Sequence, residues 1–289
     1  MTATTSPSVD PPSTVEAHPL DRRPAGVVAL LNDSIVYASR NLSHIRQIPE
    51  KLLDVTIQPL MFVVLFAYVF GGAIAVTGGT YKEYFLSGIL IQSIAFGMVG
   101  PAVAIATDAG EGVIDRFRSL PSTGTAYLLG HYLAELAGMV LAISILLITG
   151  LVVGWSTSAP LPDIVAALFL LVLFASAMIW VGTVIGLMVR TPDAVMGIAF
   201  TVVFPLTFIS NAFVPIESLP PLLEHFAAWN PISVMVEAVR ELFDNPTAGG
   251  TNSSWPLEHA VPVAFAYCVA ILAFGVTMSM VRYRKRTAD

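Results

Sequence analysis

The stretch 164-IVAALFLLVLFASAMIWVGTVIGLM-188 contains no charged side chain and is long enough to cross a lipid bilayer. A hydrocarbon core about 30 Å thick requires roughly 20 apolar residues in an α-helix that rises 1.5 Å per residue. Five further stretches meet the same criterion, so the sequence predicts an all-α polytopic membrane protein. The six predicted spans lie at approximately 55–76, 84–106, 126–153, 164–188, 194–213 and 260–281.

The composition of the whole chain agrees with a location in the bilayer. Of its 289 residues, 55% are apolar and 12% are charged, and the formal net charge is −6. A soluble domain carries roughly 25% charged residues, about twice this fraction. The composition therefore excludes a soluble single-domain enzyme, a nucleic-acid-binding protein and a disordered scaffold. Cys268 is the only cysteine, which excludes a disulfide framework.

Basic residues are distributed unequally between the connections on the two sides of the predicted bundle. One side carries only Lys82 and Arg240. The other side carries twelve: Arg22, Arg23, Arg40, Arg46, Lys51, Arg116, Arg118, Arg190, Arg282, Arg284, Lys285 and Arg286. Because basic residues accumulate in cytoplasmic connections, both termini are predicted to be cytoplasmic in a bacterial plasma membrane.

The chain before the first span has two parts with different composition. Residues 1–24 are rich in Pro, Ser and Thr, contain no apolar run, and predict a disordered cytoplasmic tail rather than a signal peptide. Residues 27–48 repeat apolar side chains at steps of three or four, which places them on one helical face. This pattern predicts a helix lying on the cytoplasmic membrane surface, with a soluble packing helix as the alternative. Residues 25–289 are predicted to form one transmembrane domain.

Two further segments are amphipathic but too short to span. The run 108-DAGEGVIDRFRSLPSTG-124 carries an apolar stripe and a charged face, which predicts a short cytoplasmic helix over 109–121. An ordinary solvated loop is the alternative. The region 214–245 is apolar but interrupted by prolines, so no single helix can run through it. We expect a pair of half-length helices that enters the outer leaflet and returns.

The chain lacks the common motifs of nucleotide, metal and nucleophile chemistry. Its lysines are Lys51, Lys82 and Lys285, and none follows a glycine, so the phosphate-binding G-x-x-x-x-G-K-[ST] loop is absent. No H-E-x-x-H or G-x-S-x-G pattern occurs. We therefore expect no cofactor in this chain. If ATP hydrolysis drives transport, we expect it to take place on another chain.

One polar pair lies inside a predicted span. His131 and Glu135 are four residues apart and share a face of the third helix. A helix that starts near Tyr127 places Glu135 roughly 12 Å into the bilayer. The pair is interpreted as part of a substrate cavity or a proton site, or alternatively as a packing contact between subunits. Gln58 and Gln92 are candidates for the same lining.

Two ordered motifs resemble those of ABC-2 type exporter permeases, in particular the daunorubicin-resistance branch. The first is 115-DRFRSLP-121, between the second and third spans. In that family such a run forms the cytoplasmic coupling helix that docks on the ATPase. The second is 190-RTPDAVMGIAFTVVFPLTFISNAFVPIESLPPLL-223 followed by 230-NPISVMVEAVREL-242. It is similar to the family's fifth helix, its F-V-P break and its extracellular re-entrant pair.

The resemblance implies a permease subunit that exports an amphiphilic drug or lipid. Two permease chains, identical or different, would work with two copies of a separate ATPase that binds ATP and Mg. Coupling to the ATPase is then expected from Glu111, Asp115, Arg116, Phe117, Arg118, Ser119 and Leu120. The substrate path or gate is expected to include Gln58, Gln92, His131, Glu135, Phe213, Pro215, Asn230 and Pro231. The alternatives are a proton-driven secondary exporter and a membrane-embedded enzyme that uses His131 and Glu135.

Overall fold

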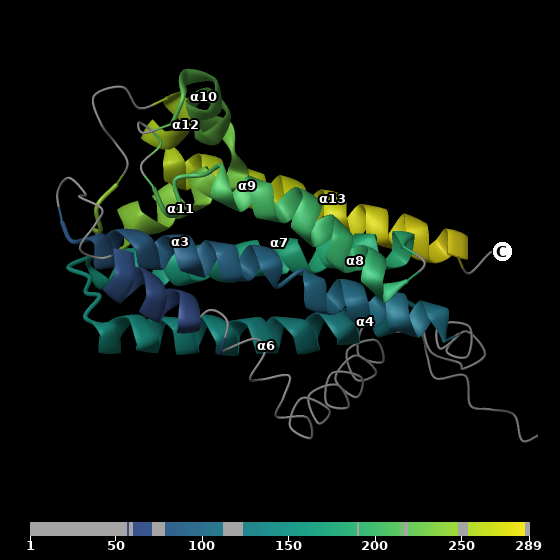
Figure 1. The fold of residues 1–289 in the computed structure, drawn as a ribbon. Helices are drawn as coiled ribbons and strands as arrows, with labels where there is room; N and C mark the ends of the chain where they lie inside the picture. The colour runs from purple at the N-terminus through teal and green to yellow at the C-terminus, as the bar shows by residue number, and fades with distance from the viewer. Residues whose placement is uncertain are drawn as a thin grey trace, which may run out of the picture.

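The computed structural model describes residues 57, 60–70, 79–111, 124–189, 191–214, 216, 219–247 and 254–286. The described part is helical throughout and contains no strand, in agreement with the predicted all-α class (Figure 1). Four stretches are long and apolar enough to cross a membrane: Tyr81–Gly110, Tyr127–Val153, Leu161–Met188 and Ala260–Tyr283. The shorter apolar helices Leu60–Val69 and Pro192–Phe208 occupy the positions of the first and fifth predicted spans. The predicted tail and surface helix lie outside the described residues.

Helix α7 (Leu161–Met188) is the centre of the bundle. It packs against α13 (Ala260–Arg286), α4 (Val99–Gly110) and α6 (Gly124–Val153), and the long helices run side by side in Figure 1. Small residues allow these helices to approach closely, as is usual where lipid gives no hydrophobic advantage to association. A Cβ on Gly182 of α7 would lie only 2.2 Å from the Met98 carbonyl oxygen.

The second span is two helices rather than the single helix predicted over 84–106. Helix α3 (Tyr81–Phe96) starts at a capping box between Thr80 and Glu83, and α4 begins after a turn at Gly97 and Met98. Pro101 explains the break, because it has no N–H to donate to the carbonyl of Gly97, four residues earlier, and its ring crowds that carbonyl.

The fifth predicted span also ends earlier than its apolar run. Three consecutive pieces form it: α8 (Pro192–Ile198), the π-helix η2 (Ala199–Val203) and α9 (Phe204–Phe208). Pro205 cannot donate the next α-helical hydrogen bond, and the π-turn accommodates it, with the Phe204 N–H donating to the Ala199 carbonyl five residues back. The prediction of helix to residue 213 is therefore wrong by five residues, and residues 209–214 are non-helical. We call residues 209–214 the break segment.

Prolines begin the short helices that follow the break segment. Helix α10 (Pro221–Trp229) and helix α11 (Pro231–Leu242) each start with a proline, where its missing N–H costs nothing. Helix α11 is buried against α13, α3 and α7, whereas α10 lies at one end of the bundle beside α12 (Trp255–Glu258) (Figure 1). The two half-length helices predicted from the prolines are thus present as separate elements.

The connections collect at two opposite ends of the bundle. One end holds the last turn of α4, the first turn of α6, the turn between α7 and α8, and the end of α13 (Figure 1). The other end holds the start of α3, the 154–160 loop, α10 and α12. The break segment lies nearer this second end.

The contact between α4 and α7 gives a prediction about stability. Gly182→Ala would place a methyl group against a main-chain oxygen that cannot move alone, and we expect a loss of about 1–3 kcal/mol. Thermal unfolding of the purified chain in detergent should show a lower Tm. Gly138→Ala in α6 is the control, because a Cβ there has no atom within 4 Å. Equal Tm values for the two variants would contradict the packing described.

Candidate functional site

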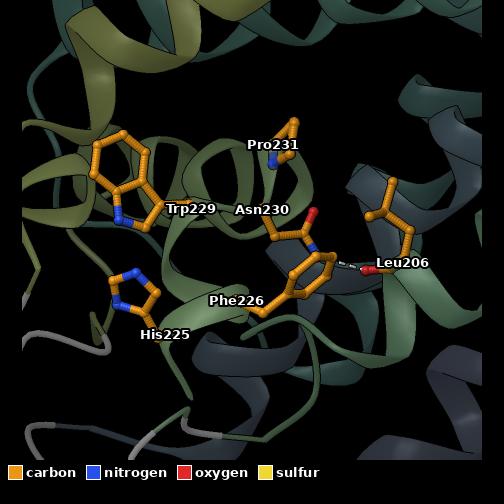
Figure 2. Close-up of a pocket in the computed structure, with 6 residues that line it drawn as sticks. All are labelled: Leu206, His225, Phe226, Trp229, Asn230 and Pro231. Carbon is orange, nitrogen blue, oxygen red and sulfur yellow. Dashed lines mark hydrogen bonds between the residues drawn. The ribbon is translucent and has the colours of Figure 1, made fainter. Parts of the chain in front are cut away.

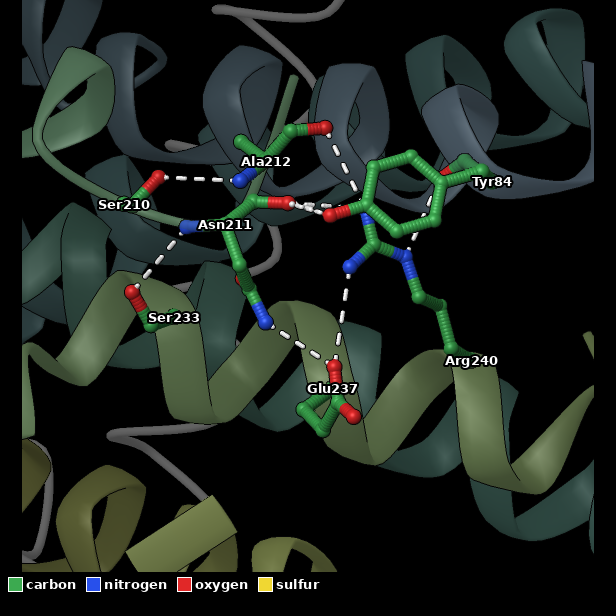
Figure 3. A network of polar contacts seen from close by, with 7 residues as sticks. All are labelled: Tyr84, Ser210, Asn211, Ala212, Ser233, Glu237 and Arg240. Atoms are coloured by element: carbon green, nitrogen blue, oxygen red, sulfur yellow. Dashed lines mark hydrogen bonds and ion pairs between the residues drawn. The ribbon is translucent and has the colours of Figure 1, made fainter. Parts of the chain in front are cut away.

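A fully buried arginine lies between helix α3 and the break segment (Figure 3). Arg240 of α11 donates from Nε to the Tyr84 carbonyl at 3.0 Å. Its Nη2 donates to the carbonyls of Asn211 at 2.9 Å and Ala212 at 3.3 Å. The guanidinium carbon lies 3.5 Å from the centre of the Tyr84 ring, a cation–π contact. One side chain therefore joins three elements of the fold.

The charge of this arginine is paired within the same cluster. Arg240 Nη1 lies 3.6 Å from Glu237 Oε2, and Asn211 Nδ2 donates to that same oxygen at 2.9 Å. The Asn211 N–H donates to Ser233 Oγ at 3.2 Å, and the Tyr84 hydroxyl donates to the Asn211 carbonyl at 3.0 Å. A buried charge is costly unless it is paired and hydrogen-bonded. This guanidinium is paired through Nη1 and hydrogen-bonded through Nε and Nη2.

The polar side chains are needed because the break leaves main-chain groups without helical partners. Asn230 closes the end of α9, its Nδ2 donating to the carbonyls of Leu206 and Ile209, each at 2.7 Å. Its Oδ1 accepts from the Ile232 N–H at 2.9 Å and so caps the start of α11. The Asn230 side chain thus ends one helix and begins another.

Helix α3 also approaches the break segment closely. A Cβ on Gly88 would lie 2.0 Å from the Ala212 carbonyl oxygen, so only glycine permits this distance. The Tyr81 hydroxyl donates to the Phe213 carbonyl at 3.2 Å. The Phe213 ring is buried and stacks 4.8 Å from the ring of Phe66. We call the break segment and the polar side chains that hold it the Arg240 cluster.

An apolar pocket of about 290 Å³ adjoins the cluster on the side of α10 (Figure 2). Its lining residues are Leu206, His225, Phe226, Trp229, Asn230 and Pro231. Asn230 belongs to both the pocket and the hydrogen-bonded end of α9, so the pocket is bordered by the helix that the break interrupts. Phe226 and Trp229 are exposed and continue the apolar surface outward.

A second, polar pocket of about 390 Å³ lies at the same end of the bundle. It is formed where the 154–160 loop meets the end of α11. Trp155 Nε1 donates to Asn245 Oδ1 at 2.8 Å, and Ser156 Oγ donates to Glu83 Oε1 at 3.2 Å. These bonds hold the loop against α3 and α11. Among the described residues, no group of three His, Cys, Asp or Glu side chains is placed so that it could hold a metal ion.

The residues predicted for the substrate path fall into separate places. Phe213, Asn230 and Pro231 lie together at the Arg240 cluster and its pocket. His131 and Glu135 lie on α6, with 3.9 Å between Nδ1 and Oε1. Gln92 is buried in α3. The common lining predicted for Gln92, His131 and Glu135 stays a prediction. Gln58 and Pro215 lie outside the described residues.

The predicted coupling helix is described only at its edge. Residues 109–110 are the end of α4, and Glu111 is the exposed residue that follows it. The helix predicted over 109–121 therefore cannot begin before residue 111. The other predicted coupling residues lie outside the described residues: Asp115, Arg116, Phe117, Arg118, Ser119 and Leu120.

The Arg240 cluster was not predicted from the sequence, because Arg240 was counted among the basic residues of the connections. A signal was present, since Ser233, Glu237 and Arg240 recur at steps of four and three on a helix whose other residues are apolar apart from Glu241. Lys82, the other basic residue assigned to that side, donates from Nζ to the Val153 carbonyl at the end of α6. Both cations thus satisfy main-chain oxygens.

The sequence profile of the ABC-2 type transporter family matches residues 34–243, which include the whole Arg240 cluster. The chain belongs to this family. This ABC-2 chain is 30% identical over 268 residues to the daunorubicin resistance ABC transporter permease protein DrrB1 of Streptomyces coeruleorubidus, covering 92% of this chain and 90% of that protein. It is 25% identical over 233 residues to the doxorubicin resistance ABC transporter permease protein DrrB of Mycobacterium tuberculosis, with 78% and 80% covered. It is 21% identical to the putative transport permease ycf38 of Cyanophora paradoxa, with 78% and 76% covered.

The ion pair in the Arg240 cluster gives the second prediction. Arg240→Gln leaves Glu237 ionised and buried without its cation, and we expect a loss of about 3–5 kcal/mol. Purified protein should show less monodisperse material on size-exclusion chromatography and a lower Tm. Adding Glu237→Gln to Arg240→Gln removes the unpaired charge and should recover part of the loss.

The matched control for this variant is Arg282→Gln, which removes an exposed arginine from the end of α13. Its Tm should equal that of the natural protein. An Arg240→Gln variant as stable as Arg282→Gln would show that the buried cation does not hold the break segment.

Proposed function

We propose that this chain is the permease subunit of an ATP-driven exporter that moves an amphiphilic drug or lipid out of a bacterial cell. The observation that carries the proposal is membership of the ABC-2 family over residues 34–243, together with two relatives named drug-resistance permeases. The largely apolar helical bundle supports an amphiphilic cargo, because a path lined by apolar side chains favours amphiphiles over ions or sugars.

The working assembly in this proposal contains two permeases, identical or different, and two copies of a separate ATPase. The ATPase binds ATP and Mg, since the permease has no Gly-Lys pair from which a phosphate-binding loop could be built. The permease remains in the plasma membrane among lipids, with both termini in the cytoplasm. In this orientation the end that carries α10 and α12 faces outward.

Coupling is assigned to residues 111–121, which leave α4 and return to α6. The Tyr127 hydroxyl donates to Asp108 Oδ2 at 2.5 Å, and this bond joins the last turn of α4 to the first turns of α6. A force applied by the ATPase to the intervening chain would therefore reach both helices together. Arg116, Arg118, Glu111 and Asp115 supply charged docking contacts, and Phe117 an apolar one.

Transmission then follows the close contact between α4 and α7. Helix α4 presses on α7 at Gly182 and Gly186, while the turn at Gly97 and Met98 separates it from α3. Movement of α4 would shift the bundle as rigid bodies between inward and outward openings. Substrate passes the first, second and fifth spans, and α10 with α11 forms the re-entrant pair that gates release.

The coupling assignment gives the third prediction. The double variant Arg116→Ala/Phe117→Ala removes a charged and an apolar contact to the ATPase. We expect the complex to insert into the membrane but ATP hydrolysis to become uncoupled from export. ATPase activity and ATP-dependent efflux of a fluorescent amphiphile are measured in proteoliposomes that contain both subunits.

Arg282→Ala serves as the control, since it also removes a cation from the same end of the bundle. This variant should keep substrate-stimulated hydrolysis and export. The docking role would be refuted if the double variant kept both activities as well.

The orientation gives the fourth prediction, for which the buried native cysteine provides a low background. Cys268 should not react with a membrane-impermeant maleimide because it is buried. In intact cells, the exposed position in Ser158→Cys should be labelled at the outer surface. Glu111→Cys should be labelled only after the membrane is permeabilised. The reverse labelling pattern would overturn the proposed orientation and, with it, the coupling role of residues 111–121.

A further inference from the structure

The Tyr127 side chain in the first turn of α6 contacts two other helices. Its hydroxyl donates to Asp108 Oδ2 in the last turn of α4 at 2.5 Å. Its ring stacks on the ring of Tyr283 near the end of α13, with 6.4 Å between the ring centres and 21° between the planes. Tyr127 is 7% exposed and Tyr283 is 8% exposed. One buried side chain therefore links α4, α6 and α13 at the end of the bundle from which residues 111–121 leave.

These contacts belong to an apolar cluster that is separate from the main core. Helices α4, α6, α7 and α13 supply its buried side chains, which are Ile105, Tyr127, Leu128, Trp180, Leu187 and Tyr283. A close-packed interior has little free volume and transmits strain, so its side chains shift together rather than one by one. A displacement of Tyr127 is therefore passed on to Tyr283 and α13.

The bond to Asp108 adds a strong polar link to α4. A hydroxyl that donates to a carboxylate forms a charge-assisted hydrogen bond, which is about twice as strong as a neutral one. Asp108 is half-buried, so the bond is less exposed to competing water than one on an open surface. The two residues are 19 positions apart and lie on either side of residues 111–121. The two ends of this segment therefore cannot move apart without breaking the bond.

A second tyrosine of α6 makes a comparable bond at another place. The Tyr132 hydroxyl donates to Ser176 Oγ of α7 at 3.0 Å, and the Tyr132 ring stacks on Trp180. Helices α6 and α7 follow one another in the chain and pack together. The bond between them does not bridge residues 111–121. Removal of the Tyr132 hydroxyl is therefore a matched control for removal of the Tyr127 hydroxyl.

We propose that Tyr127 is a positioning residue that makes the adjoining ends of α4, α6 and α13 move as one unit when the ATPase acts on residues 111–121. The hydroxyl transmits the displacement between α4 and α6, and the ring transmits it to α13. This inference rests on the proposed function and deepens it, because it brings the last helix of the chain into the coupling step. Coupling of this kind travels through contiguous packed side chains and hydrogen bonds.

The link itself is tested by hydrogen exchange on the full-length permease alone in nanodiscs. Tyr127→Phe keeps the ring and removes the hydroxyl. We expect amide exchange in the last turn of α4 to become about 10-fold faster, as for the loss of a hydrogen bond to a charged group. Tyr283→Leu removes the ring partner and should speed exchange near the end of α13 without changing α4. Tyr132→Phe should leave both places unchanged.

The coupling role is tested by double electron–electron resonance on the complex of the permease with its ATPase. Spin labels are placed at Gly110→Cys and Arg282→Cys, two exposed positions at the ends of α4 and α13, while the native Cys268 is buried. In the natural background we expect the same label separation without nucleotide and after trapping with ATP and vanadate. In Tyr127→Phe the separation should change on trapping, because α4 moves without α13.

Two comparisons separate transmission from a role in folding alone. A purely structural role would lower the Tm of Tyr127→Phe without making the label separation depend on nucleotide. Asp108→Asn retains an acceptor oxygen and should restore most of the constant separation that Asp108→Ala loses. Tyr132→Phe should behave as the natural protein does.

The outcomes distinguish this inference from the proposed function. The inference is overturned if the label separation changes with nucleotide in the natural background, or if it stays constant in Tyr127→Phe. It is also overturned if Tyr127→Phe and Tyr132→Phe show the same exchange in α4, a result that requires no ATPase. ATP-dependent export of a fluorescent amphiphile by the natural complex would uphold the proposed function in each of these cases.

Discussion

The fold depends on one buried cation that binds main-chain oxygens. The guanidinium of Arg240 accounts for the carbonyls of Tyr84, Asn211 and Ala212, while Glu237 balances its charge. In hydrocarbon, non-helical backbone is tolerated only where protein groups satisfy its polar atoms. The chain can therefore leave helical geometry after α9 because α11 returns a charged side chain to the same place (Figure 3).

This constraint divides the bundle into parts with different freedom to move. Helices α3 and α11 are joined to the break segment by polar bonds and by the close approach at Gly88. Helix α4 is separated from α3 by the turn at Gly97 and Met98, and contacts α7 instead. Helix α10 exposes apolar side chains at the end of the bundle. The Arg240 cluster near one end and α4 at the other, joined to α3 through a turn, are therefore held by different contacts.

Hydropathy was sufficient to predict the four long spans, because an apolar run of that length has few alternatives. The prolines at positions 221 and 231 predicted the two short helices. Pro101 and Pro205 likewise indicated interruptions of a helix. They lie within long apolar runs, however, and the length of those runs predicted continuous helices instead. The spacing of His131 and Glu135 predicted that they are neighbours. The partners of Arg240 could not be predicted, because they are carbonyls whose positions depend on packing between distant segments.

The stretch Tyr81–Gly110 has 30 residues, which corresponds to about 45 Å of helix, longer than the hydrocarbon core by about 15 Å. The surplus must be taken up by tilt, by the bend at Gly97, or by projection of α4 beyond the acyl chains. Whichever of the three takes up the surplus, it must change when the thickness of the surrounding membrane changes. Lipids with longer or shorter tails would accordingly change the tilt, the bend or the projection of this stretch.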